Sequence, residues 1–267
     1  MHITKMQGIG NDYLYFFGEL PADVEKLAVR LSDRHFGIGS DGLIYISESE
    51  TADFRMRIFN ADGSEARMCG NGIRCVGKYV YEKGFTDKTE LRIETLSGIR
   101  ELHLHCEGSR VTSVSVNMGT VIVSEPEKIE LDGTVLSLIP VSTGNPHAVM
   151  FVAEAGLCLP EQIGSRIEHH PLFPGGVNAE FVQVKAENRI RMRVWERGSG
   201  VTMSCGTGAC ASAAAAVNAG FCVYAQPVIV ELDGGELEIT VYEDGTVWMK
   251  GPAEFVFEAE ITMEGAE

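Results

Sequence analysis

The chain has 267 residues, of which 45% are hydrophobic and 22% charged, an ordinary composition for a globular protein of one or two domains. Its formal net charge of -16 at pH 7 excludes the basic surface that nucleic acid or an anionic membrane requires, so we expect neither as a partner. The first residues, MHITKMQGIGND, have no apolar core of signal-peptide length, and no weakly polar run is long enough to span a bilayer. We therefore expect a cytoplasmic protein.

In chain order, ten short alternating or β-branched runs between Gly- and Asp-rich turns predict strands. These runs are 2–6, 43–47, 54–59, 91–95, 111–116, 181–184, 191–195, 228–232, 237–242 and 247–251. Helical patterns are fewer and cover 21–33, 72–83, 206–219 and, more weakly, 160–170. Many strands with one long helix in each half predict an α+β fold rather than alternating βαβ units.

An internal repeat divides the chain into halves. MRIFNADGSEARMCGNG (56–72) aligns without a gap with MRVWERGSGVTMSCGTG (192–208), at an offset of 136 that superposes Cys69 on Cys205. GIGNDY (8–13) is similar to STGNPH (142–147), and the two segments share a Gly-Asn pair. Several echoes in one order indicate a duplication, with a GN turn, a strand and a Cys-Gly-x-Gly turn into a helix in each half.

The two matched cysteines would stand at helix N-termini, since glycines suit a tight turn and the alanine-rich run after Cys205 favours a helix. There the helix dipole should lower the thiol pKa, and the first N–H groups should bind a carboxylate. One reaction uses two like groups around such an anion, the inversion of a stereocentre beside a carboxylate. One cysteine removes the α-proton and the other supplies a proton to the opposite face.

The other cysteines carry no such signal. We interpret Cys106, Cys158 and Cys222 as packing residues, and Cys75 and Cys210 as buried residues inside the two helices. A zinc site is disfavoured, because glycines rather than further ligands fill the C-x5-C and C-x4-C spacings. Seven cysteines are also too few in this length for a disulfide scaffold, so we expect a reduced chain with no metal.

Three further motifs give weaker indications of function. GIGSDG (37–42) matches G-x-G-x-x-G, but a strand-like run follows it where dinucleotide binding needs a helix. His147 follows the second GN turn, in the region equivalent to Asp12, and could tune a thiol. Glu196 and Arg197 align with Asn60-Ala61, so the halves differ where an asymmetric substrate needs a difference.

The motifs together resemble the diaminopimelate epimerase family, enzymes that interconvert LL- and meso-diaminopimelate without pyridoxal phosphate. The resemblance covers nearly the whole chain and rests on these segments, in order: KMQGIGNDY, FGIGSDGLI, FNADGSEARMCGNGIRC, GNPHAV, GVNAEFVQV, WERGSG, CGTGACA and GPAEFVF. It implies two pseudo-symmetric domains, each a curved, mostly antiparallel sheet around a central helix. The last strand returns to the first domain, which gives residues 1–116 plus 253–267 and residues 117–252.

The resemblance also implies the roles of individual residues. Cys69 and Cys205 would be the acid/base pair, assisted by His147 and Glu196, in lysine and peptidoglycan precursor biosynthesis and without a cofactor. The backbone of Gly70-Asn71 and Gly206-Thr207 would hold the reacting carboxylate. The amino groups and the distal carboxylate of the substrate would be held by Asn11, Asn60, Asn145, Asn178, Glu196 and Arg197.

Two positions depart from the family pattern, Val201 in place of Glu and Gly42 where Gln is frequent. A racemase of another amino acid such as histidine, on the same fold, is the alternative activity. A non-catalytic amino-acid-binding protein with redox-sensing cysteines is the alternative of another class. In each case the partner is a small amino acid, and we expect a homodimer, the commonest symmetric assembly.

Overall fold

The computed structural model describes residues 1–156 and 159–262. The chain divides into two compact units, unit 1 from Met1–Val116 with Gly251–Glu267 and unit 2 from Asn117–Lys250. It passes from unit 1 to unit 2 within β8 (Arg110–Thr120) and returns within β18 (Thr246–Gly251). The division expected from the sequence differs from this one only in the assignment of Gly251 and Pro252.

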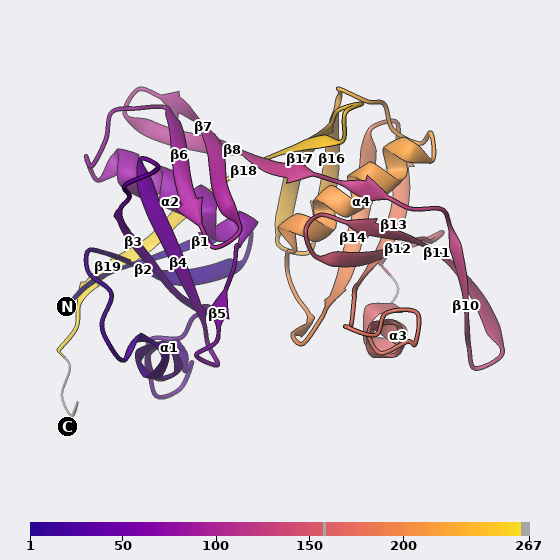
Figure 1. The fold of residues 1–267 in the computed structure, drawn as a ribbon, viewed down its shortest axis with the longest axis horizontal. Helices are drawn as coiled ribbons and strands as arrows, with labels where there is room; N and C mark the ends of the chain where they lie inside the picture. Colours follow the sequence, from indigo (N-terminus) through magenta and orange to yellow (C-terminus); the bar gives the residue numbers. More distant parts are fainter. Residues whose placement is uncertain (157–158, 263–267) are drawn as a thin grey trace. The chain divides into compact units, whose positions relative to one another are not determined.

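Unit 1 is a mixed sheet with two helices, α1 (Val24–Ser32) and α2 (Gly70–Glu82) (Figure 1). Its sheet runs β19-β1-β2-β3-β4-β6-β7-β8, with β2–β3 and β4–β6 parallel and the other neighbours antiparallel. Besides β8, its strands are β1 (His2–Gly8), β2 (Asn11–Phe17), β3 (Gly42–Glu48), β4 (Phe54–Asn60), β5 (Glu65–Ala66), β6 (Glu90–Thr95), β7 (Gly98–Glu107) and β19 (Glu254–Glu260).

Unit 2 repeats this pattern with helices α3 (Leu159–Glu168) and α4 (Gly206–Asn218). Its sheet runs β9-β11-β12-β13-β14-β16-β17-β18, with β12–β13 and β14–β16 parallel and β10 paired to β11. Besides β18, its strands are β9 (Ile122–Val123), β10 (Glu127–Leu131), β11 (Thr134–Ser142), β12 (Pro146–Phe151), β13 (Asn178–Ala186), β14 (Arg189–Glu196), β15 (Gly200–Val201), β16 (Pro227–Leu232) and β17 (Gly235–Val241).

The strand orders and directions of the two sheets correspond one to one, which supports the duplication inferred from the sequence. β9, which follows β8, pairs with β11, and β19, which follows β18, pairs with β1. After β8 and after β18, the chain therefore gives one more strand to the other unit.

All four predicted helices are confirmed to within three residues at each end, and each predicted strand run overlaps a strand. The prediction did not include β2, β7, β10, β11, β12, β19 or the two-residue strands β5, β9 and β15. In β2 and β12, consecutive residues are buried on both faces, so the alternation that marks a half-exposed strand is lost. Along the described residues, no helix is long and apolar enough to cross a membrane.

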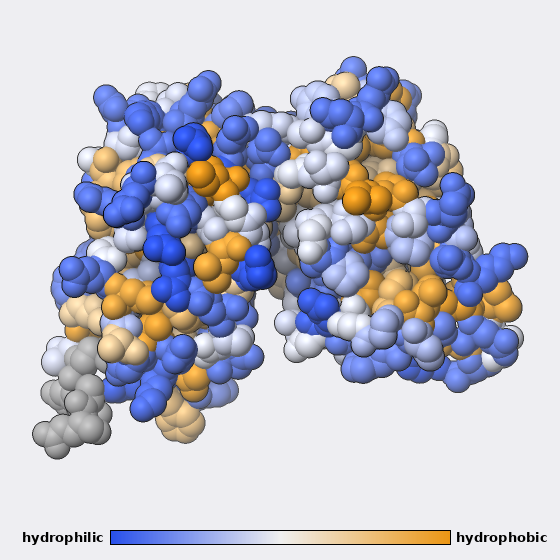
Figure 2. All heavy atoms as spheres, viewed as in Figure 1, coloured by the Kyte–Doolittle hydropathy of each residue, from blue (hydrophilic) through white to orange (hydrophobic). Residues whose placement is uncertain are grey.

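Hydrophobic clusters lie on the sheets beside α1 and α3. In unit 1, Val24, Leu27, Ala28 and Leu31 of α1 are buried against strand residues, as their helical spacing predicts. In unit 2, Ile167 of α3 lies in the corresponding cluster. On the face drawn in Figure 2, hydrophilic residues cover most of the surface of each unit, in keeping with the high content of acidic side chains.

Helix α4 is buried almost all round, unlike a surface helix with one apolar stripe. Ala209, Ala211, Ala213 and the alanines that follow have almost no exposed surface. Small side chains let the surrounding strands approach the helix closely on every side. The space around α4 is therefore filled by strand residues, with no room for a larger helical side chain.

Replacement of Ala213 by Leu should overpack this region and lower the free energy of unfolding by about 1–3 kcal/mol. The matched control is Ala219→Leu at the exposed C-terminal cap of the same helix, which should stay within about 0.5 kcal/mol of the parent. Urea denaturation followed by circular dichroism measures both. Equal losses in the two variants would contradict the close packing of α4.

Candidate active site

The two repeated cysteines are the N-caps of α2 and α4. Cys69 Sγ accepts a hydrogen bond from the Gly72 N–H at 3.3 Å, and Cys205 Sγ accepts one from the Gly208 N–H, also at 3.3 Å. Both residues have extended backbone, with φ/ψ of -136°/115° and -124°/109°. Each sulfur thus lies at the positive end of a 13-residue helix, beside N–H groups that no carbonyl of that helix can accept from.

Glycine stands at the third position of each helix, where an added Cβ would force a neighbouring side chain to shift. A Cβ on Gly72 would stand 2.6 Å from Ile44 Cδ1, and a Cβ on Gly208 would stand 2.8 Å from Glu180 Oε1. The same added atoms would lie 3.5 Å from Cys69 Cβ and 3.2 Å from Cys205 Sγ. Absence of a side chain lets a neighbouring strand press against the first turn beside the thiol.

Neutral polar groups surround Cys69, which is partly buried. Its thiol donates to Asn11 Oδ1 at 3.3 Å, and Asn11 Nδ2 donates to Asp41 Oδ2 at 2.7 Å. The Asp41 carboxylate can only accept, so it fixes which end of the Asn11 amide faces the sulfur. Burial, followed by the proximity of Cys69 and Asp41, raises the pKa of Tyr13 well above its ordinary value, so this neighbour stays an uncharged phenol.

Cys205 is buried, with carboxyl groups nearby. Burial raises the pKa of Cys205 well above its ordinary value, and the charges of Glu196 and Glu180 raise it further. Hydrogen bonds from Thr207 and the Gly208 N–H lower the Cys205 pKa, but the net change is still a rise. The expectation of a lowered thiol pKa is therefore wrong for Cys205, because burial and like charge outweigh the helix terminus.

Glu196 is a half-buried carboxyl group in contact with this thiol. Burial raises the pKa of Glu196, while hydrogen bonds with Thr202 and Cys205 lower it and leave a net rise. The charge of Glu180 also raises the pKa of Glu196, and that of His147 lowers it. The structure thus brings Cys205, Glu196 and His147 together as the sequence predicted, and it adds Glu180 and Thr202.

His147 lies one position from its expected place in the repeat. The register pairs Tyr13 with Gly42 and His147 with Asn178, and Gly42 corresponds to Asn178 at the offset of 136. The counterpart of His147 is therefore Tyr13 and not Asp12. Its ring is fully buried and bonds through Nδ1 to Glu180 Oε1 at 2.6 Å.

The remaining predicted residues fall into local groups within each unit. In unit 1, Asn71 Oδ1 accepts from Arg74 at 2.9 Å, and Asn60 Nδ2 donates to Ser64 Oγ at 3.1 Å at the end of β4. In unit 2, Asn145 Nδ2 donates to Thr207 Oγ1 at 3.5 Å, beside the Cys205 thiol. Gly70 and Gly206 are the first residues of α2 and α4.

Asn178 and Arg197 form the second local group of unit 2. Asn178 Oδ1 accepts from the Arg197 N–H at 2.8 Å, and the Arg197 guanidinium donates to Gly175 O at 3.0 Å. Arg197 is exposed, whereas Asn178 is buried. Asn178 thus holds the backbone from which the guanidinium extends toward solvent.

Both departures from the family pattern have local explanations. A Cβ on Gly42 would stand 2.2 Å from Phe59 O, so this backbone admits only glycine there. Strand register places Val201 at the position of Glu65, which pairs with Arg57 in unit 1. The counterpart Arg193 pairs instead with Glu161 at 2.6 Å and Asp233 at 3.1 Å, so no carboxylate is needed at 201.

Sequence reasoning missed Tyr13, Asp41, Glu180 and Thr202. Glu180 left one signal, a carboxylate directly between the apolar residues Ala179 and Phe181 of a strand. Cys75, Cys210 and Cys222 are buried as expected, Cys106 is half-buried, and Cys158 lies outside the described residues.

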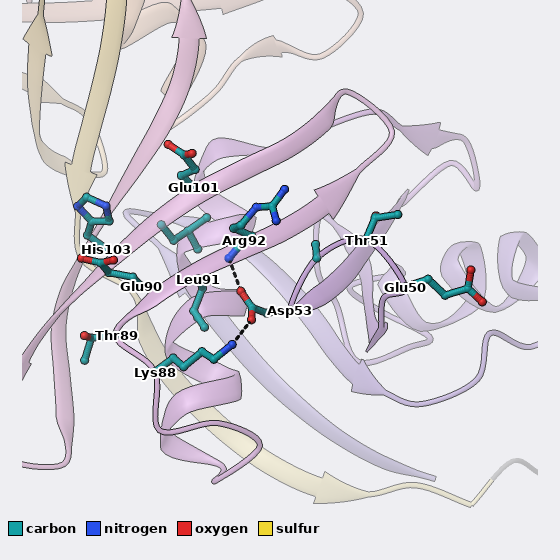
Figure 3. Close-up of a pocket in the computed structure, with 12 residues that line it drawn as sticks. Glu50, Thr51, Asp53, Lys88, Thr89, Glu90, Leu91, Arg92, Glu101 and His103 are labelled. Carbon is teal, nitrogen blue, oxygen red and sulfur yellow. Dashed lines mark hydrogen bonds and ion pairs between the residues drawn. The ribbon is translucent and has the colours of Figure 1, made fainter.

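A groove of about 970 Å³ in unit 1 lies apart from the cysteines (Figure 3). It is lined by residues between Glu50 and Asp53, between Lys88 and Arg92, and between Glu101 and His103. Asp53 there is paired with Lys88 at 2.6 Å and accepts from the Arg92 N–H at 2.7 Å. Within residues 1–156 and 159–262, no group of three or more His, Cys, Asp or Glu could hold a metal ion.

Comparison with solved structures supports the predicted α+β fold of two domains. A Bacillus anthracis phenazine biosynthesis protein of the PhzF family has a TM-score of 0.78 at 18% identity, over 98% of this chain and 99% of that one. A hydroxyproline epimerase from Agrobacterium vitis has a TM-score of 0.71 at 18% identity, over 100% and 93%. At these identities the likeness concerns the fold alone.

Sequence comparison is more specific. A family model described as diaminopimelate epimerase matches residues 3–123 and 139–256, two stretches that begin at the repeat offset of 136. Relatives named diaminopimelate epimerase include those of Acetivibrio thermocellus, 48% identical over 98% of this chain and 99% of the relative, and of Bacteroides thetaiotaomicron, 52% identical over 98% and 97%. The chain belongs to the diaminopimelate epimerase family.

Proposed function

We propose that the protein epimerises LL-diaminopimelate to meso-diaminopimelate, a step toward lysine and peptidoglycan precursors, by proton transfer between substrate and two cysteines. The observation that carries the proposal is the repeated cysteine N-cap, with the same sulfur–N–H bond at Cys69 and Cys205. In a member of this family, the duplication supplies the two like groups that a two-base inversion needs.

In this mechanism the α-carboxylate of the substrate accepts hydrogen bonds from N–H groups in the first turn of a cysteine-capped helix. One cysteine, as thiolate, removes the α-proton, and the other, as thiol, gives a proton to the opposite face. The negative charge that develops toward the carboxylate is stabilised by helix N–H groups already oriented for it. The reverse reaction exchanges the two roles, and each positioned proton transfer contributes about 10²–10⁴-fold to the rate.

Glu196 can accept the proton of the Cys205 thiol, which burial otherwise keeps protonated. Transfer of the Cys205 proton to the Glu196 carboxylate gives a thiolate and a neutral carboxylic acid, so the net charge of the pair is conserved. Because burial penalises one negative charge before and after the transfer, the cost of forming the thiolate is reduced.

The distal amino-acid head is assigned to Arg197 and Asn178 of unit 2. A guanidinium binds a carboxylate through two parallel hydrogen bonds, and amide oxygens accept from an ammonium group. Arg197 is exposed and its backbone is held by Asn178, which suits it to a carboxylate that enters from solvent.

Cys69→Ala and Cys205→Ala should each lower epimerisation by at least about 10²-fold, because inversion needs both a base and an acid. The measurement is the incorporation of solvent deuterium at the α-carbon, followed by NMR together with the stereoisomer ratio. Cys222→Ala, at a buried cysteine outside both helices, is the control and should retain activity. Near-parental interconversion by either active-site variant would overturn the two-base proposal.

LL-diaminopimelate should be turned over with a higher kcat/KM than L-histidine, because only the former has a distal head for Arg197 to bind. Arg197→Gln should raise the KM for LL-diaminopimelate and reduce the ratio of its kcat/KM to that for L-histidine. A parental preference for L-histidine would assign the protein to the racemase alternative. Failure of both amino acids to exchange deuterium would favour a binding protein.

Removal of the Glu196 charge should lower the pKa of Cys205, since that charge disfavours the thiolate. In Glu196→Gln, Cys205 should therefore ionise at lower pH, and its alkylation by iodoacetamide at a fixed alkaline pH should be faster. Rates are read by peptide mass spectrometry against pH in a Cys69→Ala background. Glu161→Gln is the control, because the Glu161 charge is not among those that shift the Cys205 pKa; an unchanged or higher pKa in Glu196→Gln would refute the coupling.

A further inference from the structure

One face of β2 lies against the first turn of α2 in unit 1. Asn11, Tyr13 and Tyr15 are two residues apart along this strand, so their side chains project from the same face. At one end of the row, Asn11 Oδ1 accepts from the Cys69 thiol at 3.3 Å. At the other end, Tyr15 Oη donates to Gly72 O at 3.4 Å. Tyr13 stands between them, with its phenol beside the Cys69 sulfur.

The Tyr13 phenol is buried, with 6% of the residue exposed, and it is hydrogen-bonded to this sulfur. Burial is the main cause of the raised pKa of Tyr13, the charges of Cys69 and Asp41 raise it further, and the hydrogen bond with Cys69 adds to the rise. A hydrogen bond with Asn11 lowers this pKa without cancelling the rise. Because the bond to Cys69 favours the protonated phenol, the phenol is its donor and the sulfur its acceptor.

Asn11 has the opposite preference for the state of the thiol. Its Oδ1 can only accept, so it bonds to the S–H of a thiol and repels the lone pairs of a thiolate. The amide is held in this orientation because Nδ2 donates to Asp41 Oδ2 at 2.7 Å, and Asp41 is itself paired with Arg34 at 3.1 Å. A thiolate at Cys69 therefore needs donors from elsewhere, and the Gly72 N–H at 3.3 Å is one of them.

We propose that the Tyr13 hydroxyl is a second donor, which stabilises the Cys69 thiolate during the proton transfers of the epimerisation. The inference rests on the proposed function and extends it to a residue that touches a reacting sulfur. When the thiol gives its proton to the substrate carbanion, the S–H bond breaks, a C–H bond forms and an electron pair stays on sulfur. The phenol keeps its own proton and donates a hydrogen bond to the charge on sulfur. When Cys69 acts as the base, the same hydrogen bond is present before the transfer.

Unit 2 has no phenol at the equivalent position, because His147 is the counterpart of Tyr13. The Cys205 thiol lies instead near carboxyl groups that disfavour its thiolate. In the proposed mechanism the two sulfurs thus become charged by different means. Cys69 receives a hydrogen bond from a neutral donor, whereas Cys205 passes its proton to the Glu196 carboxylate.

The test compares Tyr13→Phe with the matched control Tyr45→Phe. Both changes remove one phenolic oxygen from a buried tyrosine of unit 1, but among the described residues Tyr45 Oη has no hydrogen-bond partner. Alkylation of Cys69 by iodoacetamide is measured against pH by peptide mass spectrometry, in a Cys205→Ala background. Turnover of LL-diaminopimelate is measured in proteins that retain both cysteines. Both variants keep the other charged and titratable groups of this region, which are Asp41 before β3, Tyr15 on β2, and Arg74 and Cys75 on α2.

In Tyr13→Phe, the midpoint of Cys69 alkylation should move upward by about one pH unit, because a hydrogen bond to a charged group contributes roughly a factor of ten or more. The kcat should fall about 10-fold, with KM within about twofold of the parent value, because the lost hydrogen bond is to the sulfur and not to the substrate. Tyr45→Phe should match the parent protein in both measurements.

A Cys69 alkylation profile that Tyr13→Phe leaves unchanged would overturn the proposal, as would a shift to lower pH or an equal shift in Tyr45→Phe. A loss of activity confined to KM would also contradict it. The alkylation profile does not depend on catalysis, so failure of the epimerase proposal would appear separately, as absence of deuterium exchange in the parent protein.

Discussion

The fold and the site both depend on a cysteine that caps a helix whose third residue is glycine. The cap places sulfur at the positive end of α2 or α4, and the glycine lets position 44 or 180 of the neighbouring strand lie against the first turn. These two positions correspond in the repeat. The contact therefore fixes the thiol, the helix start and the strand that supports them in each unit.

Divergence at a few equivalent positions made the two half-sites different. Ile44 in unit 1 corresponds to Glu180 in unit 2, Tyr13 to His147, and Asn60 to Glu196. The Cys69 thiol therefore donates to a neutral amide, whereas two carboxyl groups raise the pKa of the Cys205 thiol and one of them bonds to an imidazole. Two half-sites with the same backbone and different side chains suit an asymmetric substrate that has one reacting centre.

The sequence predicted the parts that local chemistry determines. The Cys-Gly-x-Gly turns, the helices after them and the offset of 136 all follow from residues near one another in the chain. The raised pKa of Cys205 was not predictable in this way, because it comes from the burial of α4 and the packing of β13 against its first turn. The GN turns repeat at an offset of 134, which already aligns Tyr13 with His147, and strand register supports the same pairing.

The acidity of the chain and the capture of a carboxylate are compatible because they act on different scales. A net charge of -16 produces a field that acts on the total charge of a ligand, and diaminopimelate, with two ammonium and two carboxylate groups, has none. In the proposed mechanism, helix N-termini and Arg197 would act on single groups at contact distance, where screening by salt is weak. Proton transfer from Cys205 to Glu196 would leave the local charge unchanged as well. The negative field of the protein therefore opposes neither the binding of diaminopimelate nor the ionisation of the Cys205 thiol in the proposed mechanism.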